Sequence, residues 1–78
     1  MRIKHWSIKT HTKEHYISTV WLDISGHYET MVFAYGKEHK IDWKDKHVAI
    51  TKGKQRAVTN HCTAIRLVME WESHAKNA

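Results

Sequence analysis

With 78 residues the chain is long enough for one domain and too short for a second core, so we expect residues 1–78 to form a single domain. The sequence contains no apolar run of about 18 residues and no apolar stretch behind the N-terminal charges, which argues against a transmembrane helix and a signal peptide. The net charge of +5 favours anionic partners and the single cysteine excludes an internal disulfide, so we expect a cytoplasmic protein that is not bound to a membrane.

The first half of the chain predicts three strands. A heavily charged edge strand is expected at about residues 2–9. Residues 16–24 are rich in the β-branched and aromatic side chains that strands favour. Ser25 and Gly26 then predict a two-residue turn, because glycine readily adopts a positive φ, and residues 27–35 return as the antiparallel partner.

This turn also predicts which side chains share a face of the sheet. If Ile24 lies opposite His27 across the turn, the alternation of side chains divides the hairpin into two faces. The face expected to form the core carries larger apolar side chains: Val20, Leu22, Met31 and Phe33. The face expected to stay open carries a mixture of small, β-branched and aromatic residues: Ile17, Thr19, Trp21, Tyr28, Thr30, Val32 and Ala34.

An open face with so much apolar surface is typical of a protein interface or a homodimer contact. The candidate protein-binding residues are therefore Ile17, Thr19, Trp21, Tyr28 and Val32. An alternative is that Trp43 and Ile41, from the charged segment after the hairpin, fold back and cover this face.

The last third of the chain predicts one amphipathic helix. A short strand is expected at about residues 47–50, Thr51 is a candidate N-cap, and the helix is expected at about residues 52–74. At 100° per residue, the apolar half of this helix carries Trp71, Ala57, Ala64, Val68, His61, Ile65, Val58, Met69 and Cys62. The predicted fold is therefore α+β: a three- to four-stranded antiparallel sheet with one C-terminal helix packed on one face.

Three segments resemble a group of small, uncharacterised phage and prophage proteins. They are the STVWL string at residues 18–22, the ETMVF string at residues 29–33, and the helix segment from Ala57 to His61. This chain departs from those proteins in its tight turn and in having Asn60 where they often have glycine. The resemblance implies a phage origin and a location in the host cytoplasm, and it implies no activity.

Glu29 and His61 are both expected on core-facing surfaces, where an unpaired carboxylate or imidazole would be costly. We therefore predict a structural polar pair between them. A general-base dyad is the remote alternative, because no nucleophile or oxyanion-binding loop accompanies the pair. No catalytic residue is assigned, and we expect the protein not to be an enzyme.

Neither a metal site nor a cofactor is expected. His11 and His15 are four residues apart, but their segment reads as a connection between strands and no third ligand is obvious. Cys62, on the apolar half of the helix, is expected to be a small core residue, because a reactive thiolate needs exposure and nearby positive charge.

Two functions remain open from the residues. The leading hypothesis is a non-enzymatic protein-binding or dimerising module, whose partner is an unknown host protein or a second copy. The alternative is a nucleic-acid-binding module in which Lys52, Lys54 and Arg56 contact phosphates at the helix start, with Trp6 or Trp43 stacking on bases. The strand order and basic helix start also faintly resemble the second half of a double-stranded-RNA-binding domain, whose first helix is missing here.

Overall fold

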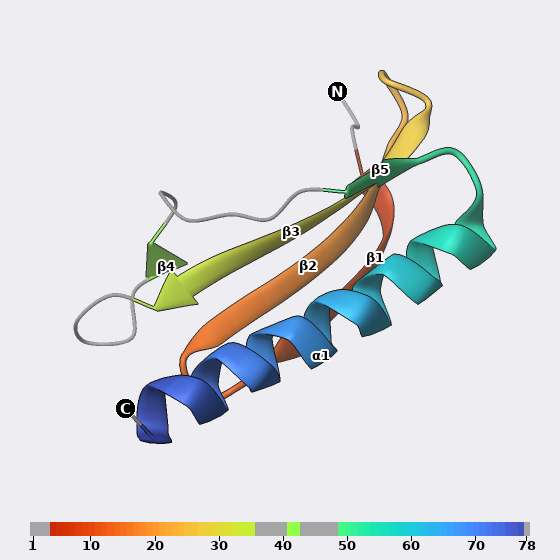
Figure 1. Ribbon diagram of the computed structural model, residues 1–78. Helices are drawn as coiled ribbons and strands as arrows, with labels where there is room; N and C mark the ends of the chain where they lie inside the picture. Colours follow the sequence, from red (N-terminus) through yellow and green to blue (C-terminus); the bar gives the residue numbers. More distant parts are fainter. Residues whose placement is uncertain (1–3, 36–40, 43–48, 78) are drawn as a thin grey trace.

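The computed structural model describes residues 4–35, 41–42 and 49–77. In chain order these form β1 (Lys4–His11), β2 (His15–Leu22), β3 (His27–Tyr35), β4 (Ile41–Asp42), β5 (Ala49–Thr51) and α1 (Lys54–Asn77). All strand pairings are antiparallel, with β1, β2 and β3 side by side and both β4 and β5 paired with β3. The helix lies along one face of the sheet (Figure 1), which confirms the predicted α+β fold with one C-terminal helix.

The hairpin between β2 and β3 differs from the predicted one in its turn. Leu22 pairs with His27, so residues 23–26 form the connection in place of the predicted two-residue turn at Ser25 and Gly26. Gly26 has the expected positive φ, 71°, and its amide donates to the carbonyl of Leu22 at 2.8 Å. Because this register differs from the predicted one by two residues, every side chain stays on its predicted face.

The helix packs on the opposite face from the one that the sequence predicts. Ile17 and Val32 form the buried core with Ala64 and Val68 of α1, although both strand residues were assigned to the open face. Their neighbours on this face, Thr19 and Thr30, are also fully covered. The sequence pattern misleads because the other face is buried at its centre as well, at Ser18, Val20 and Phe33. Alternation therefore gives no contrast between a buried face and an exposed one.

The helix begins later than predicted and uses only part of its apolar half. Thr51 belongs to β5, and the carbonyl of Gly53 accepts the first helical hydrogen bond from the amide of Ala57 at 3.0 Å. The buried stripe repeats at helical spacing: Ala57, His61, Ala64 and Val68. Cys62, predicted in the core, is exposed. Within the described residues, no helix has the length and apolarity to cross a membrane.

Glu72 fixes the far end of the helix to the turn between β1 and β2. Its carboxylate accepts hydrogen bonds from the Thr12 hydroxyl at 2.5 Å and the Glu14 amide at 3.1 Å, and lies 2.8 Å from Nδ1 of His15. Burial alone would raise the pKa of Glu72, but the hydrogen bonds from Thr12, His15 and Glu14 and the charge of His15 lower it overall. The helix is thereby held at a defined position along the sheet.

Candidate nucleic-acid interface

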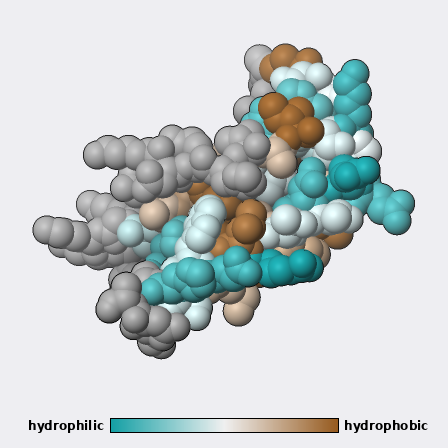
Figure 2. Space-filling view, viewed as in Figure 1, coloured by the Kyte–Doolittle hydropathy of each residue, from teal (hydrophilic) through white to brown (hydrophobic). Residues whose placement is uncertain are grey.

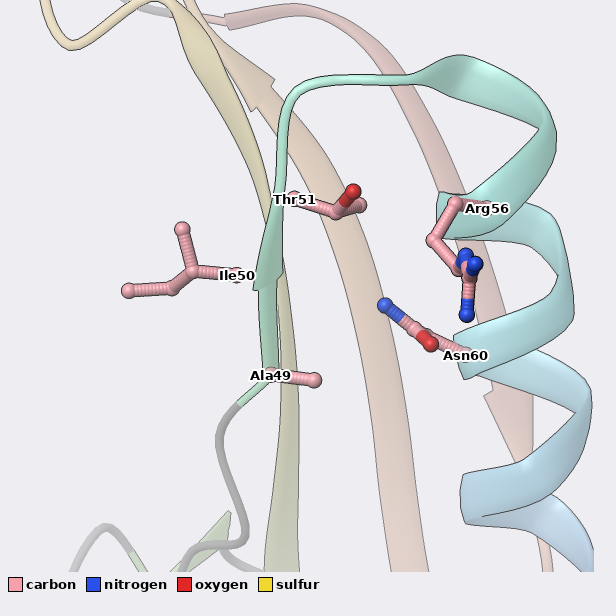
Figure 3. Close-up of a pocket in the computed structure, with 5 residues that line it drawn as sticks. All are labelled: Ala49, Ile50, Thr51, Arg56 and Asn60. Carbon is pink, nitrogen blue, oxygen red and sulfur yellow. The ribbon is translucent and has the colours of Figure 1, made fainter.

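A groove of about 510 Å³ lies between β5 and the first turns of α1. It is lined by Ala49, Ile50, Thr51, Arg56 and Asn60. In the close-up, the side chains of Ala49 and Thr51 point toward the helix, whereas Ile50, the residue between them, points to the other side of the sheet (Figure 3). This is the alternation expected of a strand, and it leaves the hydroxyl and methyl groups of Thr51 and the methyl group of Ala49 on the strand wall of the groove.

The helix wall of the groove is polar. Arg56 and Asn60 are four residues apart, so they lie on the same side of α1. In Figure 3 the Asn60 side chain extends toward β5, whereas the Arg56 side chain runs along the helix toward Asn60. Arg56 is exposed and Asn60 is partly exposed. The groove therefore presents the donors of a guanidinium, an amide and a hydroxyl, a set that suits a phosphate or the edge of a nucleobase.

The connection before α1 and the first turn of the helix carry basic side chains and no acidic one, whereas Asp23 accepts a hydrogen bond from Nε1 of the neighbouring Trp21 at 2.5 Å. The basic residues of this connection and first turn are Lys52, Lys54 and Arg56. Basic side chains near a helix N-terminus oppose the helix dipole, which costs about 0.3–1 kcal/mol for each nearby charge. These cations therefore do not stabilise the helix, whereas an anion bound beside them would be favoured by the cations and the dipole together.

The structure separates the three basic residues that the sequence predicts as nucleic-acid ligands. Arg56 lines the groove, Lys52 is exposed in the connection before the helix, and Lys54 lies over an aromatic ring, with Nζ 5.0 Å from the centroid of Trp6. The sequence does not predict Asn60 and Thr51 as groove residues, because Asn60 is one of several polar residues of the helix and Thr51 has the side chain of an N-cap.

Beside the groove, three aromatic side chains form what we term the aromatic row: Trp6, Trp21 and Tyr28. The Tyr28 ring packs edge-on against Trp6, with centroids 5.3 Å apart, and lies 4.7 Å from Trp21. Tyr28 also pairs across the strands with Thr51, which lines the groove. All three rings are partly exposed. Trp43, the other stacking candidate, lies outside the described residues, and nothing is shown of the proposed cover by Trp43 and Ile41.

The predicted protein-binding surface does not exist as an open face. Ile17 and Thr19 are 0% exposed and Val32 is 3% exposed, because the helix covers them. Only Trp21 and Tyr28 of that set remain partly exposed, as members of the aromatic row. On the side of the molecule seen in Figure 2, the hydrophobic residues among those coloured form separate patches between hydrophilic ones.

His61 does not pair with Glu29. Its Nε2 is hydrogen-bonded with the Thr10 hydroxyl at 2.8 Å and its Nδ1 with the Thr19 hydroxyl at 2.7 Å, and Thr19 continues to Thr30 at 2.8 Å. Glu29 lies on the opposite face of the sheet, where it contacts His27 at 3.1 Å. Burial lowers the pKa of His61. With 3% exposure, this imidazole has a structural role between helix and sheet and cannot reach a substrate.

Two other strand histidines, His11 and His15, also have partners. His11 hydrogen-bonds with the hydroxyl of Tyr35, and His15 contacts Glu72. Among the residues that the structure describes, no group of three histidine, cysteine, aspartate or glutamate side chains is arranged to hold a metal ion.

Searches against family models, curated proteins and solved structures give no significant match to this chain.

Proposed function

We propose that this protein is a non-enzymatic module that binds the phosphate backbone of a nucleic acid at the groove between β5 and the start of α1. The observation that carries the proposal is the position of Arg56, in a groove beside a helix start that bears only basic charge. The second sequence hypothesis thus replaces the first, because three of the five residues proposed for a protein contact are buried. An origin in a phage and a site of action in the host cytoplasm stay predictions.

The groove residues suit different parts of such a contact. The guanidinium of Arg56 can donate two parallel hydrogen bonds to one phosphate, and the Asn60 amide and Thr51 hydroxyl can add neutral ones. Lys52 and Lys54 would add charge next to the free amides of the first helical turn. Contacts of these kinds position the protein on a nucleic acid without reading its sequence, so we expect weak sequence preference.

The test is fluorescence anisotropy with a labelled mixed-sequence oligonucleotide, titrated at several salt concentrations. Affinity should fall steeply as salt rises, because bound phosphates release counterions. Arg56→Gln should weaken binding about tenfold, equivalent to about 1.4 kcal/mol, and should reduce the slope of log affinity against log salt by about 0.7–0.9.

Arg66→Gln is the matched control, because it removes the same charge from an exposed position on the same helix that does not line the groove. It should change affinity much less than Arg56→Gln. Equal losses for the two variants would reduce the effect to net charge, and binding that ignores salt would overturn the proposal.

A further inference from the structure

The aromatic row occupies the end of the helix-facing side of the sheet where α1 begins. It adjoins the groove directly, because Tyr28 and Thr51 are strand neighbours. Mutual ring packing holds the side chains in place, and the Trp21 indole also donates a hydrogen bond to the carboxylate of Asp23. All three rings keep part of their surface in contact with solvent. A fixed, partly exposed set of rings next to basic side chains is the arrangement on which unpaired bases stack.

A second aromatic cluster in the molecule shows what distinguishes the first. His11, Tyr16, Phe33 and Tyr35 pack together near the opposite end of the strands. That cluster lies close to the turn held by Glu72, and the amide of Tyr35 donates to the carbonyl of Glu14. Of these two clusters in the described residues, the aromatic row is the one that combines rings with a lysine, Lys54, and adjoins the groove that contains Arg56.

We infer that the nucleic acid bound at this interface is single-stranded, with one or more bases stacked on the aromatic row while the adjoining phosphates contact Arg56 and Lys54. The inference rests on the proposed function. A duplex keeps its bases stacked on one another, so it can offer phosphates to the groove but no base face to Trp6 or its neighbours.

The experiment compares three anionic probes: oligothymidylate, a duplex of the same length, and inorganic polyphosphate. The wild-type protein should bind oligothymidylate at least about tenfold more tightly than the duplex, because stacking adds to the phosphate contacts. Tryptophan fluorescence should be quenched by oligothymidylate and not by polyphosphate. Trp6→Leu should lose about tenfold in affinity for oligothymidylate while keeping its affinity for polyphosphate.

Trp71→Leu is the matched control. Trp71 is 45% exposed and lies at the other end of α1, next to His15, so its replacement should leave all three affinities unchanged. Photo-crosslinking of the wild-type protein to oligothymidylate needs no variant and should give adducts at Trp6, Trp21 or Tyr28. This arm decides the question even if Trp6→Leu fails to fold.

The outcomes separate the two proposals. If the duplex or polyphosphate binds as tightly as oligothymidylate, or crosslinks fall only outside the aromatic row, single-strand binding is overturned while phosphate binding stands. If none of the three probes binds, the proposed function fails, and the inference fails with it.

Discussion

The two ends of the helix–sheet interface are built on different principles. Beneath the middle and C-terminal part of α1, Ile17 and Val32 are covered together with Ala64 and Val68 of the helix. The Glu72 carboxylate is matched there to donors from the turn between β1 and β2. Around the N-terminal end, the rings are partly exposed, the start of the helix carries only basic side chains, and a groove remains between helix and strand. One carboxylate, that of Asp23, accepts a hydrogen bond from Nε1 of Trp21 at this end. One end satisfies its polar groups internally. The other leaves them directed outward, which is the arrangement expected of a binding end.

The largest loss of stability is expected from a mutation in the covered end of the interface, where Ile17 lies beneath α1. Ile17→Ala should destabilise the fold by about 2–5 kcal/mol, because it removes buried methyl groups and leaves a cavity beneath α1. This is a large part of the few kcal/mol that stabilise a domain of this size. Urea denaturation followed by circular dichroism measures the difference.

Ile24→Ala is the control for that prediction, because Ile24 is 70% exposed in the connection between β2 and β3. Its stability should stay within about 0.5 kcal/mol of the wild type. If Ile17→Ala were as harmless as Ile24→Ala, the helix would not cover this face, and the open-face hypothesis drawn from the sequence would return.

A smaller effect is expected from the contact that fixes the helix end. Glu72→Gln should cost about 1.5 kcal/mol, since hydrogen bonds to a charged group are lost or weakened. Glu70→Gln makes the same change at an exposed position two residues earlier and should be nearly neutral. Equal midpoints for the two variants in urea would show that Glu72 does not hold the helix in place.

The Glu72 carboxylate also makes the folding stability depend on pH in the acid range. Because the folded-state pKa of Glu72 lies below its usual value of 4.5, its contribution to stability is complete above that pH. The contribution is lost as pH falls through the lowered folded value. Glu72→Gln should therefore show a shallower loss of stability in this acid range than the wild type does.

The course of the chain could be predicted from sequence, whereas the contacts between its elements could not. The presence of β2, β3 and α1 follows from local composition and from the period of the helix. The choice of face failed because Ser18, Val20 and Phe33 on one side of the sheet are buried like Ile17 and Val32 on the other.

The prediction of a polar pair between Glu29 and His61 was wrong for a related reason. His61 needs partners, but sequence alone could not show that Thr10 and Thr19, not Glu29, lie beneath it. For the candidate site, the basic residues were visible as a cluster. The groove was not visible, because its walls come from β5 and α1 and only their packing creates it.

The smallest predicted effect lies at the middle of the interface, where His61 joins the two ends. Burial lowers the folded-state pKa of His61 below its usual value of 6.5, so the unfolded chain takes up a proton there more readily than the folded protein does. Stability should be complete above that pH and should fall as pH drops from about 7.5 to about 5.5. The loss should be smaller than that from Glu72→Gln, because the hydroxyls of Thr10 and Thr19 can still accept hydrogen bonds from both nitrogens of a protonated ring.

Urea denaturation across this pH range measures the slope of stability against pH for the wild type, His61→Gln and His74→Gln. His74 is exposed on the same helix, so its replacement should leave the slope as in the wild type. His61→Gln should flatten the slope, whatever it does to stability at neutral pH. A slope that is identical in all three proteins would mean that the His61 imidazole takes up its proton as easily in the folded protein as in water. The middle of the interface would then resemble the end that is open to solvent.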